Sequence, residues 1–497
     1  MNKIQKKELY FKEEMKERKM KVLFVSSECA PFFKTGGLGD VAGALPKELA
    51  KKSEIDSVAV ILPYFKNEMK EEYRSLLKDE FYDFVDVGWR HEYVGVKSLE
   101  KEGVKYYFLD NEHYFGRGQL YGYGDDGERF AFFDLALCQL LEKLDFIPDV
   151  LHVNDWQTAM VPFLLKEKYN WIKAYEKIKT VLTIHNIEFQ GLMHGDALSE
   201  LFGMGMERYF EGVVRHNGML NMLKTGILYA DRVNTVSPTY AKEIQTSEFG
   251  CGLESILQYV DGKVSGILNG IDYDIYNPEN DILIPYHFSE EELSGKGQMK
   301  AELQKRTGLP LNPNVPLIGM VSRLTNQKGF DLVLSQLEKV LEENVQIVLL
   351  GTGFPEIEEG FRYFSQKYPD KLSANIAFDL QFAQEIYAGS DFFLMPSAFE
   401  PCGLSQMIAM RYGTLPIVHE IGGLKDTVIP FNPISKEGTG FGFVDFGGQI
   451  LLETINRALE VYGKEPEVLN KMVLSAMSKD FSWGTKAQQY IELYQEL

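Results

Sequence analysis

The fold class is decided by residues 21–49, KVLFVSSECAPFFKTGGLGDVAGALPKEL. Its opening apolar run has the composition of a buried parallel strand, and a helix is expected from near Leu38. Between them, Gly36 and Gly37 let the backbone approach an anion at the amino end of that helix, close to the positive charge of Lys34. The stretch matches neither GxGxxG nor a P-loop with its final GK[ST]. It is therefore either an anion-binding loop or a plain tight turn between strand and helix.

The same alternation of apolar runs and amphipathic stretches continues along the chain and restarts after about residue 263. With 497 residues, the chain exceeds the ~250–300 at which a single core stops growing. We predict an α/β protein of two Rossmann-like, doubly wound domains. The candidate strands are 21–27, 56–63, 104–110, 149–155 and 180–186, then 315–323, 344–353, 375–380, 391–397 and 414–420, and candidate helices include 129–144 and 158–168.

Composition excludes several classes of function. The formal net charge of −20 repels nucleic acid and anionic membranes, and no apolar run reaches the ~18 residues of a membrane span. The cysteines lack the spacing of a zinc site or a disulfide framework, which suits a reducing cytoplasm. Residues 1–19 mix Lys and Glu without the apolar stretch of a signal peptide, and a short charged helix is possible there. The cysteines are Cys29, Cys138, Cys251 and Cys402.

Polar side chains follow two neighbouring strands of the first half. Asp155 and Trp156 end one strand, and His185 and Asn186 end the next. A lone histidine in such a place is usually structural. Two adjacent strand ends with polar residues favour a shared site, because ligands of parallel sheets bind at the carboxyl ends of the strands.

The second half adds two cations and a carboxylate. Arg323 ends a strand and Lys328 precedes the next helix, so a planar fork and a point charge can close on a diphosphate. Taken alone, the pair could also be surface charge. Glu400 precedes Pro401, which holds it extended and free to bond sugar hydroxyls, although a carboxylate at a helix start is the plainer interpretation. The whole set suits a diphosphate joined to a polyhydroxylated group.

Ten motifs in this order, from about residue 20 to 495, resemble the bacterial glycogen synthases and plant starch synthases. They are KTGGLGDV, ERFAFF (128–133), HVNDWQT (152–158), IHN, VNTVSPTYAKEI (233–244), LNGID (268–272), SRLTNQKG, EPCGLSQMIAMRYG, GGLKDTV (422–428) and FSWGTKAQQYIELY (481–494). The resemblance implies a GT-B fold, in which two Rossmann-like domains face each other across a cleft.

The resemblance also implies domain boundaries and a reaction. The reaction is the retaining, metal-independent transfer of glucose from ADP-glucose to the non-reducing 4-hydroxyl of an α-1,4-glucan such as glycogen, with no cofactor. The implied parts are a charged extension at 1–19, an acceptor-binding and catalytic domain at 20–265, a nucleotide-sugar-binding domain at 266–475, and a terminal helix at 476–497 that returns to the first domain.

Site residues carry over onto matching positions. Arg323 and Lys328 would grip the diphosphate, with help from Lys34, while Glu400 and His185 would position the glucosyl ring. The other residues implied to line the cleft or contact substrate are Asp155, Gly36, Gly37, Asp40, Asn186, Asn269, Cys402, Gly403 and Leu404.

One departure separates this chain from related transferases with an E-x7-E pattern, such as sucrose synthase. The second Glu of that pattern is replaced by Ile408, and Gln406 lies in a GLSQ string, which favours the glycogen and starch synthase branch. The only DxD-like string, 272–274, is interpreted as a hinge turn rather than a cation site.

Some alternatives remain open on the sequence alone. They are a transferase that uses UDP-glucose and a non-catalytic protein that binds nucleotide-sugar or glucan. A glucan phosphorylase would need a longer chain and a lysine segment for its pyridoxal phosphate. Oligomeric state and primer length are not determined by any motif.

Overall fold

The computed structural model describes residues 19–497, so the short charged helix considered for 1–19 lies outside the described residues except for Lys19. The chain divides into two compact units, each described here by itself. The first contains residues up to Val236, Ala241–Ile267 and Trp483–Leu497. The second contains Ser237–Tyr240 and Leu268–Ser482.

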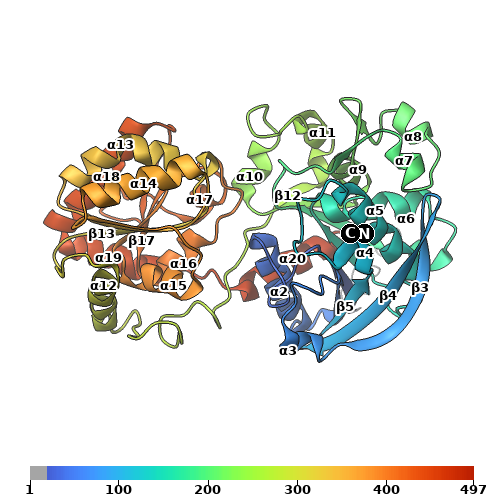
Figure 1. The fold of residues 1–497 in the computed structure, drawn as a ribbon, viewed down its shortest axis with the longest axis horizontal. Helices are drawn as coiled ribbons and strands as arrows, with labels where there is room; N and C mark the ends of the chain where they lie inside the picture. The colour runs from blue at the N-terminus through green and yellow to red at the C-terminus, as the bar shows by residue number, and fades with distance from the viewer. Residues whose placement is uncertain (1–18) are drawn as a thin grey trace, which may run out of the picture. The chain divides into compact units, whose positions relative to one another are not determined.

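The first unit is built on a nine-stranded sheet of order β12-β11-β7-β6-β1-β2-β5-β4-β3, beside a small sheet of order β8-β10-β9. The large sheet is parallel except for the long antiparallel hairpin of β3 and β4 at one edge (Figure 1). Its strands are β1 (Met20–Val25), β2 (Ile55–Pro63), β3 (Lys78–Val87), β4 (Arg90–Lys101), β5 (Val104–Asp110), β6 (Val150–Asn154), β7 (Lys179–Ile184), β11 (Arg232–Thr235) and β12 (Val264–Gly266). The small sheet holds β8 (Leu192–Met193), β9 (Arg215–His216) and β10 (Met219–Asn221).

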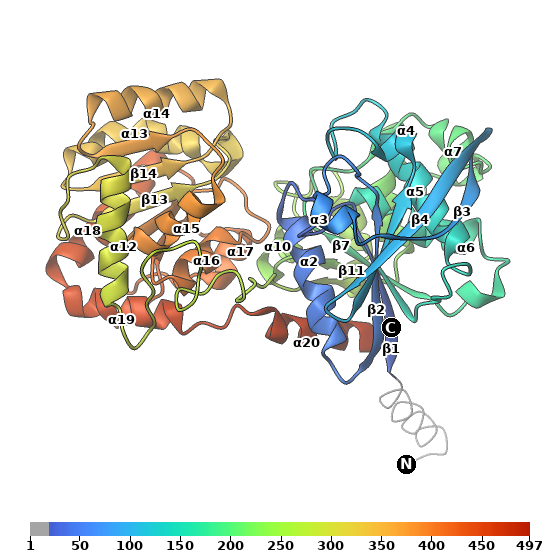
Figure 2. The ribbon, with the colours of Figure 1, turned by 60° about the horizontal axis from the view of Figure 1, so that its bottom comes forward.

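The last helix of the chain belongs to the core of the first unit. It packs beside α2, as Figures 1 and 2 both show, and its Tyr494 hydroxyl lies 2.7 Å from Nδ1 of the buried His152 on β6. The helices are α2 (Gly37–Ala50), α3 (Glu71–Arg74), α4 (Glu112–Phe115), α5 (Asp126–Leu140), η1 (Trp156–Thr158), α6 (Val161–Glu167), η2 (Lys173–Tyr175), α7 (Ala197–Glu200), α8 (Glu207–Phe210), α9 (Met222–Tyr229), α11 (Glu254–Tyr259), η3 (Asp261–Lys263) and α20 (Trp483–Gln495), with α10 (Pro238–Glu243) spanning the boundary between units.

The second unit is a parallel six-stranded sheet of order β15-β14-β13-β16-β17-β18. Figure 1 shows α13, α14 and α18 on one side of it and α12, α15 and α16 on the other. The strands are β13 (Leu317–Val321), β14 (Gln346–Leu350), β15 (Leu372–Asn375), β16 (Phe392–Met395), β17 (Leu415–His419) and β18 (Phe441–Phe443). The helices are α12 (Ser294–Thr307), η4 (Asn326–Lys328), α13 (Phe330–Glu342), α14 (Pro355–Lys367), α15 (Leu380–Gly389), α16 (Ser405–Arg411), α17 (Gly422–Thr427), α18 (Gly448–Lys464) and α19 (Pro466–Met477).

The predicted fold class, two doubly wound α/β units, is confirmed, and all but one of the predicted strands overlap an observed strand over at least half of their length. The strand predicted at 375–380 is wrong, because β15 ends at Asn375 and a helix begins at Leu380. Asp379 caps that helix by accepting the Phe382 N–H at 2.9 Å, and the apolar Phe378 is 84% exposed in the loop. Within residues 19–497, no helix is both long and apolar enough to cross a membrane.

The contact between Tyr494 and His152 gives a stability prediction. Tyr494→Phe leaves the buried Nδ1 of His152 without its partner, so the free energy of unfolding should fall by about 1–2 kcal/mol in urea denaturation. Tyr259→Phe is the control, because the Tyr259 side chain is 83% exposed, and it should change stability by less than about 0.5 kcal/mol. Equal losses in the two variants would contradict this role of the last helix.

Candidate functional site

The glycine-rich turn of the first unit is held by a carboxylate from its own chain. The buried Glu28 accepts hydrogen bonds from the Thr35 N–H at 2.5 Å, the Thr35 hydroxyl at 3.2 Å and the Gly36 N–H at 3.3 Å. Burial raises the pKa of Glu28, and the two backbone bonds oppose that rise. The Gly36 amide predicted to face an anion is therefore engaged by an internal one. A Cβ added at Gly37 would meet no atom within 4 Å, so the backbone is open there.

Lys34 forms an ion pair with Asp40, the first acidic residue of α2. Lys34 Nζ lies 2.6 Å from Asp40 Oδ1, and the two side chains are 38% and 34% exposed. Pairs this exposed contribute little to stability, so Lys34 can exchange Asp40 for a bound anion at small cost. The sequence placed both residues at the site but did not predict that they bind each other.

The structure brings Asp155, His185 and Asn186 together at the ends of β6 and β7. Asp155 adopts φ +55°, a left-handed conformation that is uncommon for a non-glycine residue. Its Oδ1 accepts the His185 N–H at 2.6 Å and the Asn186 N–H at 3.4 Å. Backbone strain of this kind persists only where surrounding structure fixes it, and here the two backbone hydrogen bonds to Asp155 Oδ1 hold the turn.

Burial acts on these two titratable groups in opposite directions. It raises the pKa of Asp155 to about 7 and lowers the pKa of His185 to about 3. His185 Nε2 lies 2.9 Å from Asn154 Oδ1, and the Asn154 amide group donates to the Val25 carbonyl at 2.9 Å. Oδ1 is thus the acceptor, so Nε2 carries the proton and Nδ1 has a lone pair. At neutral pH the ring is uncharged and suited to sugar hydroxyls.

Two further residues near this cluster, Tyr121 and Ser27, were not predicted from the sequence. The Tyr121 hydroxyl lies 2.7 Å from Ser27 Oγ, and burial, with smaller contributions from the charges of Glu28 and Asp155, raises the pKa of Tyr121. Tyr121 comes from a glycine-rich loop, GRGQLYGYGDD (116–126), that matches none of the motifs quoted from the sequence. The signal for that loop was Arg129 of ERFAFF, which is fully buried and donates to the backbone carbonyls of the loop and its flank, at Tyr114 (2.8 Å) and Leu120 (3.1 Å).

In the second unit the structure pairs two predicted site residues directly. Lys328 Nζ lies 2.5 Å from Glu400 Oε2, and their side chains are 17% and 7% exposed. Ser397 donates a further bond to the same oxygen at 3.1 Å. Gly329, with φ +73°, lets the chain turn against the Pro396 carbonyl, since a Cβ there would lie 2.0 Å from that oxygen. The lysine therefore lies between the strand ends of β13 and β16.

Arg323 is exposed at the end of β13 and has no ion-pair partner among residues 19–497. Its loop packs against the strand end of β14, where Leu324 bridges to Gly353. A Cβ at Gly351 would lie 2.0 Å from the Ser322 carbonyl, and one at Gly353 would lie 2.1 Å from the Leu324 carbonyl. The GTG string at 351–353 thus supports the loop that presents the guanidinium.

The EPCGL loop (400–404) packs closely against two glycines at the start of α17. A Cβ at Gly422, where φ is +47°, would lie 1.9 Å from the Glu400 carbonyl, and one at Gly423 would lie 2.1 Å from the Cys402 carbonyl. Gln406 donates to the carbonyls of Cys402 at 3.1 Å and Gly403 at 3.0 Å. The Gln406 side chain therefore holds the backbone of this loop in place. The Cys402 thiol is buried, so this segment offers backbone groups, with Gly403 and Leu404 partly exposed.

Asn269 and the DxD-like string lie in the first segment of the second unit. The side chain of Asn269 is buried, and its Oδ1 has no hydrogen-bond partner among the described residues. Asp272 Oδ1 accepts the Asp274 N–H at 2.9 Å, and the Tyr273 hydroxyl accepts the Phe481 N–H at 2.9 Å. The string thus forms a local turn. No group of three or more His, Cys, Asp or Glu in residues 19–497 could hold a metal ion.

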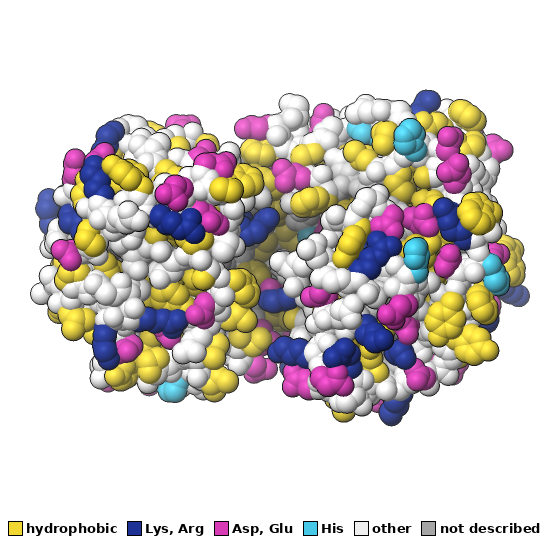
Figure 3. All heavy atoms as spheres, in the orientation of Figure 1, with side chains coloured by type: hydrophobic (Ala, Val, Ile, Leu, Met, Phe, Trp, Pro, Cys, Tyr) yellow, Lys and Arg dark blue, Asp and Glu magenta, His cyan; other side chains and the backbone are white. Residues whose placement is uncertain are grey.

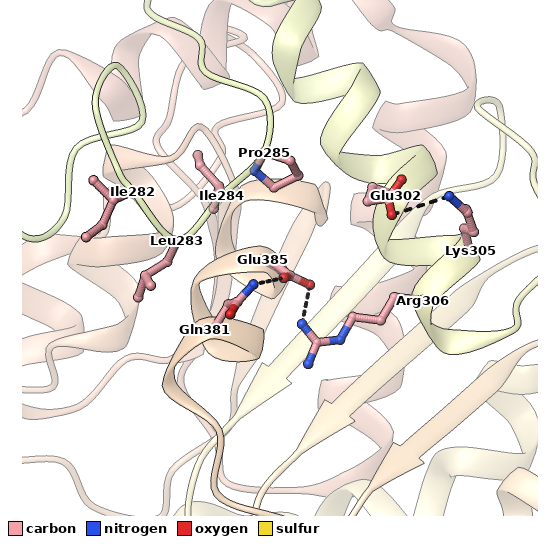
Figure 4. Close-up of a pocket in the computed structure, with 9 residues that line it drawn as sticks. All are labelled: Ile282, Leu283, Ile284, Pro285, Glu302, Lys305, Arg306, Gln381 and Glu385. Carbon is pink, nitrogen blue, oxygen red and sulfur yellow. Dashed lines mark hydrogen bonds and ion pairs between the residues drawn. The ribbon is translucent and has the colours of Figure 1, made fainter.

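A pocket of about 550 Å³ in the second unit contains none of the predicted site residues (Figure 4). Its charged groups satisfy one another, because Arg306 pairs with Glu385 at 2.7 Å and Gln381 bonds to Glu385 at 3.1 Å. We assign no function to it. The lining residues are Ile282, Leu283, Ile284, Pro285, Glu302, Lys305, Arg306, Gln381 and Glu385.

The close approach at Gly422 predicts the effect of one methyl group. Gly422→Ala must displace the Glu400 backbone, and a misplacement of about 1 Å at a reacting centre costs roughly a hundredfold in turnover. Gly463→Ala in α18, where a Cβ meets nothing within 4 Å, is the matched control and should retain native kcat. Native turnover in Gly422→Ala would show that the position of Glu400 is not limiting.

The raised pKa of Asp155 predicts how stability depends on pH. A carboxyl whose folded pKa lies near 7, above the ~3.9 of an unfolded chain, stabilises the fold below about pH 4 and loses that contribution as pH rises to 7. Asp155→Asn does not titrate. Urea denaturation should therefore show the native chain losing stability relative to the variant between about pH 4 and 7. Parallel stability curves would contradict the raised pKa.

Comparison with known proteins identifies the family of this chain. Residues 21–259 match the family model of the starch synthase catalytic domain, and residues 301–472 match that of glycosyl transferases group 1. The chain is 99% identical to a glycogen synthase of Lactococcus lactis subsp. lactis over 96% of this chain and 100% of the relative, and 58% identical to one of Streptococcus agalactiae over the same shares.

Solved structures extend the comparison to the fold. The catalytic domain of starch synthase IV from Arabidopsis thaliana, bound to ADP and acarbose, superposes with a TM-score of 0.89 at 35% identity, covering 96% of this chain and 99% of that one. A sucrose-phosphate synthase from Thermosynechococcus elongatus, at 17% identity and a TM-score of 0.60, shares the fold alone. The chain has the GT-B fold and belongs to the glycogen and starch synthase family of glycosyltransferases.

Proposed function

We propose that this chain transfers glucose from ADP-glucose to the non-reducing 4-hydroxyl of an α-1,4-glucan, retaining the anomeric configuration and using no metal and no cofactor. Two comparisons support the substrates. The relative with 99% identity is a glycogen synthase, and the starch synthase structure with 35% identity holds ADP and acarbose.

The observation that carries the proposal is the group of charges at the strand ends of the second unit. The partly buried Lys328 lies 2.5 Å from the buried Glu400, and the nearby Arg323 is exposed with no ion-pair partner among the described residues. A departing nucleoside diphosphate gains negative charge, and fixed cations stabilise that charge more than they stabilise the ground state. Arg323 offers a bidentate fork, and Lys328 offers a point charge already fixed by Glu400.

The remaining groups divide between sugar and phosphate. Glu400, whose second oxygen is not used by Lys328, and the uncharged His185 have the acceptors that orient a glucosyl ring. Asp155, with its pKa near 7, lines the same end of the first sheet. Further substrate contacts are assigned to Lys34, Gly36, Gly37, Asp40, Asn186 and Asn269, and to the backbone of Cys402, Gly403 and Leu404.

Cytoplasmic location is part of the proposal. None of the four cysteines forms a disulfide within residues 19–497, and three of them are buried, which suits a reducing compartment.

A donor assay tests the proposal. With ADP-glucose and a glycogen primer, ADP release and chain lengthening should proceed in EDTA and exceed the rate with UDP-glucose. Arg323→Ala should lower kcat by about a hundredfold to a thousandfold, the usual effect of removing one preorganised donor. Arg362→Ala, which removes a half-exposed arginine of α14 in the same unit, should leave kcat unchanged.

Three outcomes would contradict different parts of it. Strict dependence on Mg²⁺ or Mn²⁺ would overturn metal-free transfer. Faster reaction with UDP-glucose would replace the donor but leave the transferase. Binding of ADP-glucose and glucan without any turnover would favour a non-catalytic binding protein.

A further inference from the structure

One face of the hairpin of β3 and β4 carries a row of aromatic rings open to solvent. Tyr82 is 67% exposed, Phe84 42% and Tyr93 45%, and the side chain of His91 is 67% exposed. The rings contact one another in sequence, with centroids 6.0 Å apart for Tyr82 and Tyr93, 6.2 Å for Tyr93 and Phe84, and 4.8 Å for Phe84 and His91. Figure 3 shows apolar side chains gathered over these strands. We call these four residues the ring row.

The strand register explains why the rings share a face. Phe84 pairs with Tyr93 across the hairpin, and Tyr82 pairs with Gly95. A Cβ at Gly95 would lie 2.6 Å from the Tyr93 hydroxyl, so the missing side chain is what lets Tyr93 lie across to Tyr82. Side chains alternate along strands, and the opposite face of the hairpin is core, with Val85 and Val94 at 0% exposure.

Contacts with the rest of the first unit hold the ring row in place without a ligand. Gln139 of α5 donates to the Phe84 carbonyl at 2.6 Å, and Lys143, just after that helix, pairs with Asp83. At the tip, Gly88 packs so closely that a Cβ would lie 1.7 Å from the Glu200 carbonyl. Rigid aromatic groups lose little conformational entropy on binding, so this face is preorganised.

The negative charge of β3 limits which molecules can bind to the ring row. β3 has the sequence KDEFYDFVDV, with four acids and one lysine, so pairing with β3 of a second copy would place acids against acids. The Phe84 carbonyl on its outer edge is already used by Gln139. Nucleic acid and anionic lipid are repelled by the same acids. An uncharged polyhydroxylated polymer is not repelled by these acids. Its ring faces can stack on the aromatic side chains, and its hydroxyls can donate hydrogen bonds to carboxylates such as Asp86.

We propose that the ring row binds a stretch of α-glucan chain apart from the reacting end, so that the polymeric acceptor is anchored to the first unit. From residue 82 to residue 86 a strand spans about 13 Å, the length of a few sugar rings. His91 is oriented by Asp86, whose Oδ1 lies 2.7 Å from His91 Nδ1. The inference rests on the proposed function, since it assumes that the acceptor is a glucan.

Anchoring has a kinetic signature that distinguishes it from the reaction site. A long polymer occupies the ring row and the reaction site together, which raises the local concentration of chain ends. A short oligosaccharide occupies only one of the two at a time. Loss of the ring row should therefore weaken the use of glycogen and leave the use of maltotriose intact.

The test compares full-length variants. Tyr82→Ala with Tyr93→Ala should raise the KM for glycogen by roughly tenfold, because the avidity contribution is lost, and should reduce retention in glycogen-containing native gels. The KM for maltotriose, the KM for ADP-glucose and kcat should not change. Tyr82→Leu with Tyr93→Leu keeps apolar bulk without rings and should behave like the alanine pair. Tyr259→Ala, another highly exposed tyrosine of the first unit, should match the native chain.

Each other result overturns the inference in a recognisable way. Unchanged glycogen retention in both double variants means that the ring row does not bind glucan. Equal losses with glycogen and maltotriose place the effect in the reaction site. A native dimer that dissociates in the variants during sedimentation makes the ring row a contact between copies. If the native chain binds glycogen but transfers no glucose to maltotriose, the proposed function fails while the ring row stands.

Discussion

The partly buried ion pair between Lys328 and Glu400 is the contact on which the proposed site depends. A carboxylate that is 7% exposed is costly to ionise unless a cation lies against it, and here that cation is 2.5 Å away. In the proposed function, the same lysine offers its fixed positive charge to a donor phosphate. Gly329 and Gly422 allow the loops that hold Lys328 and Glu400 to lie this close, because a Cβ at either glycine would collide with backbone. Removing Lys328 leaves the buried Glu400 carboxylate without its cation.

The two units differ in the chemistry that their strand ends display. The second unit carries Arg323 and Lys328, which suit a diphosphate. The first unit carries Glu28 and Asp155, both with a raised pKa, beside an uncharged His185. Acidic and neutral groups of this kind suit hydroxyls rather than phosphates. In the proposed function, Arg323 and Lys328 of the second unit hold the donor diphosphate with help from Lys34 of the first unit, and the proposed ring row adds a second glucan-binding face to the first unit.

Much of the fold and many of the site residues could be predicted from the sequence. Buried parallel strands have Val- and Ile-rich runs, and the loops that follow them hold the polar residues of the site. The sequence analysis named Lys328 and Glu400 but not their ion pair, since the spacing of 72 residues gives no sign of contact. Glu28 was missed for the same reason, as a carboxylate that caps a turn looks like any other acid. The strand predicted at 375–380 was wrong because apolar residues in an exposed loop mimic a buried run. Conformation at Gly422 and Asp155 appears only in three dimensions.

Calorimetry of ADP binding tests the central claim most directly, namely that side-chain cations of the second unit hold the diphosphate. The account predicts that the intact chain binds ADP in EDTA, that adding Mg²⁺ leaves the Kd unchanged, and that Arg323→Ala with Lys328→Met abolishes binding while the protein remains folded. Binding that appears only with Mg²⁺, or that survives unchanged in the double variant, would contradict it.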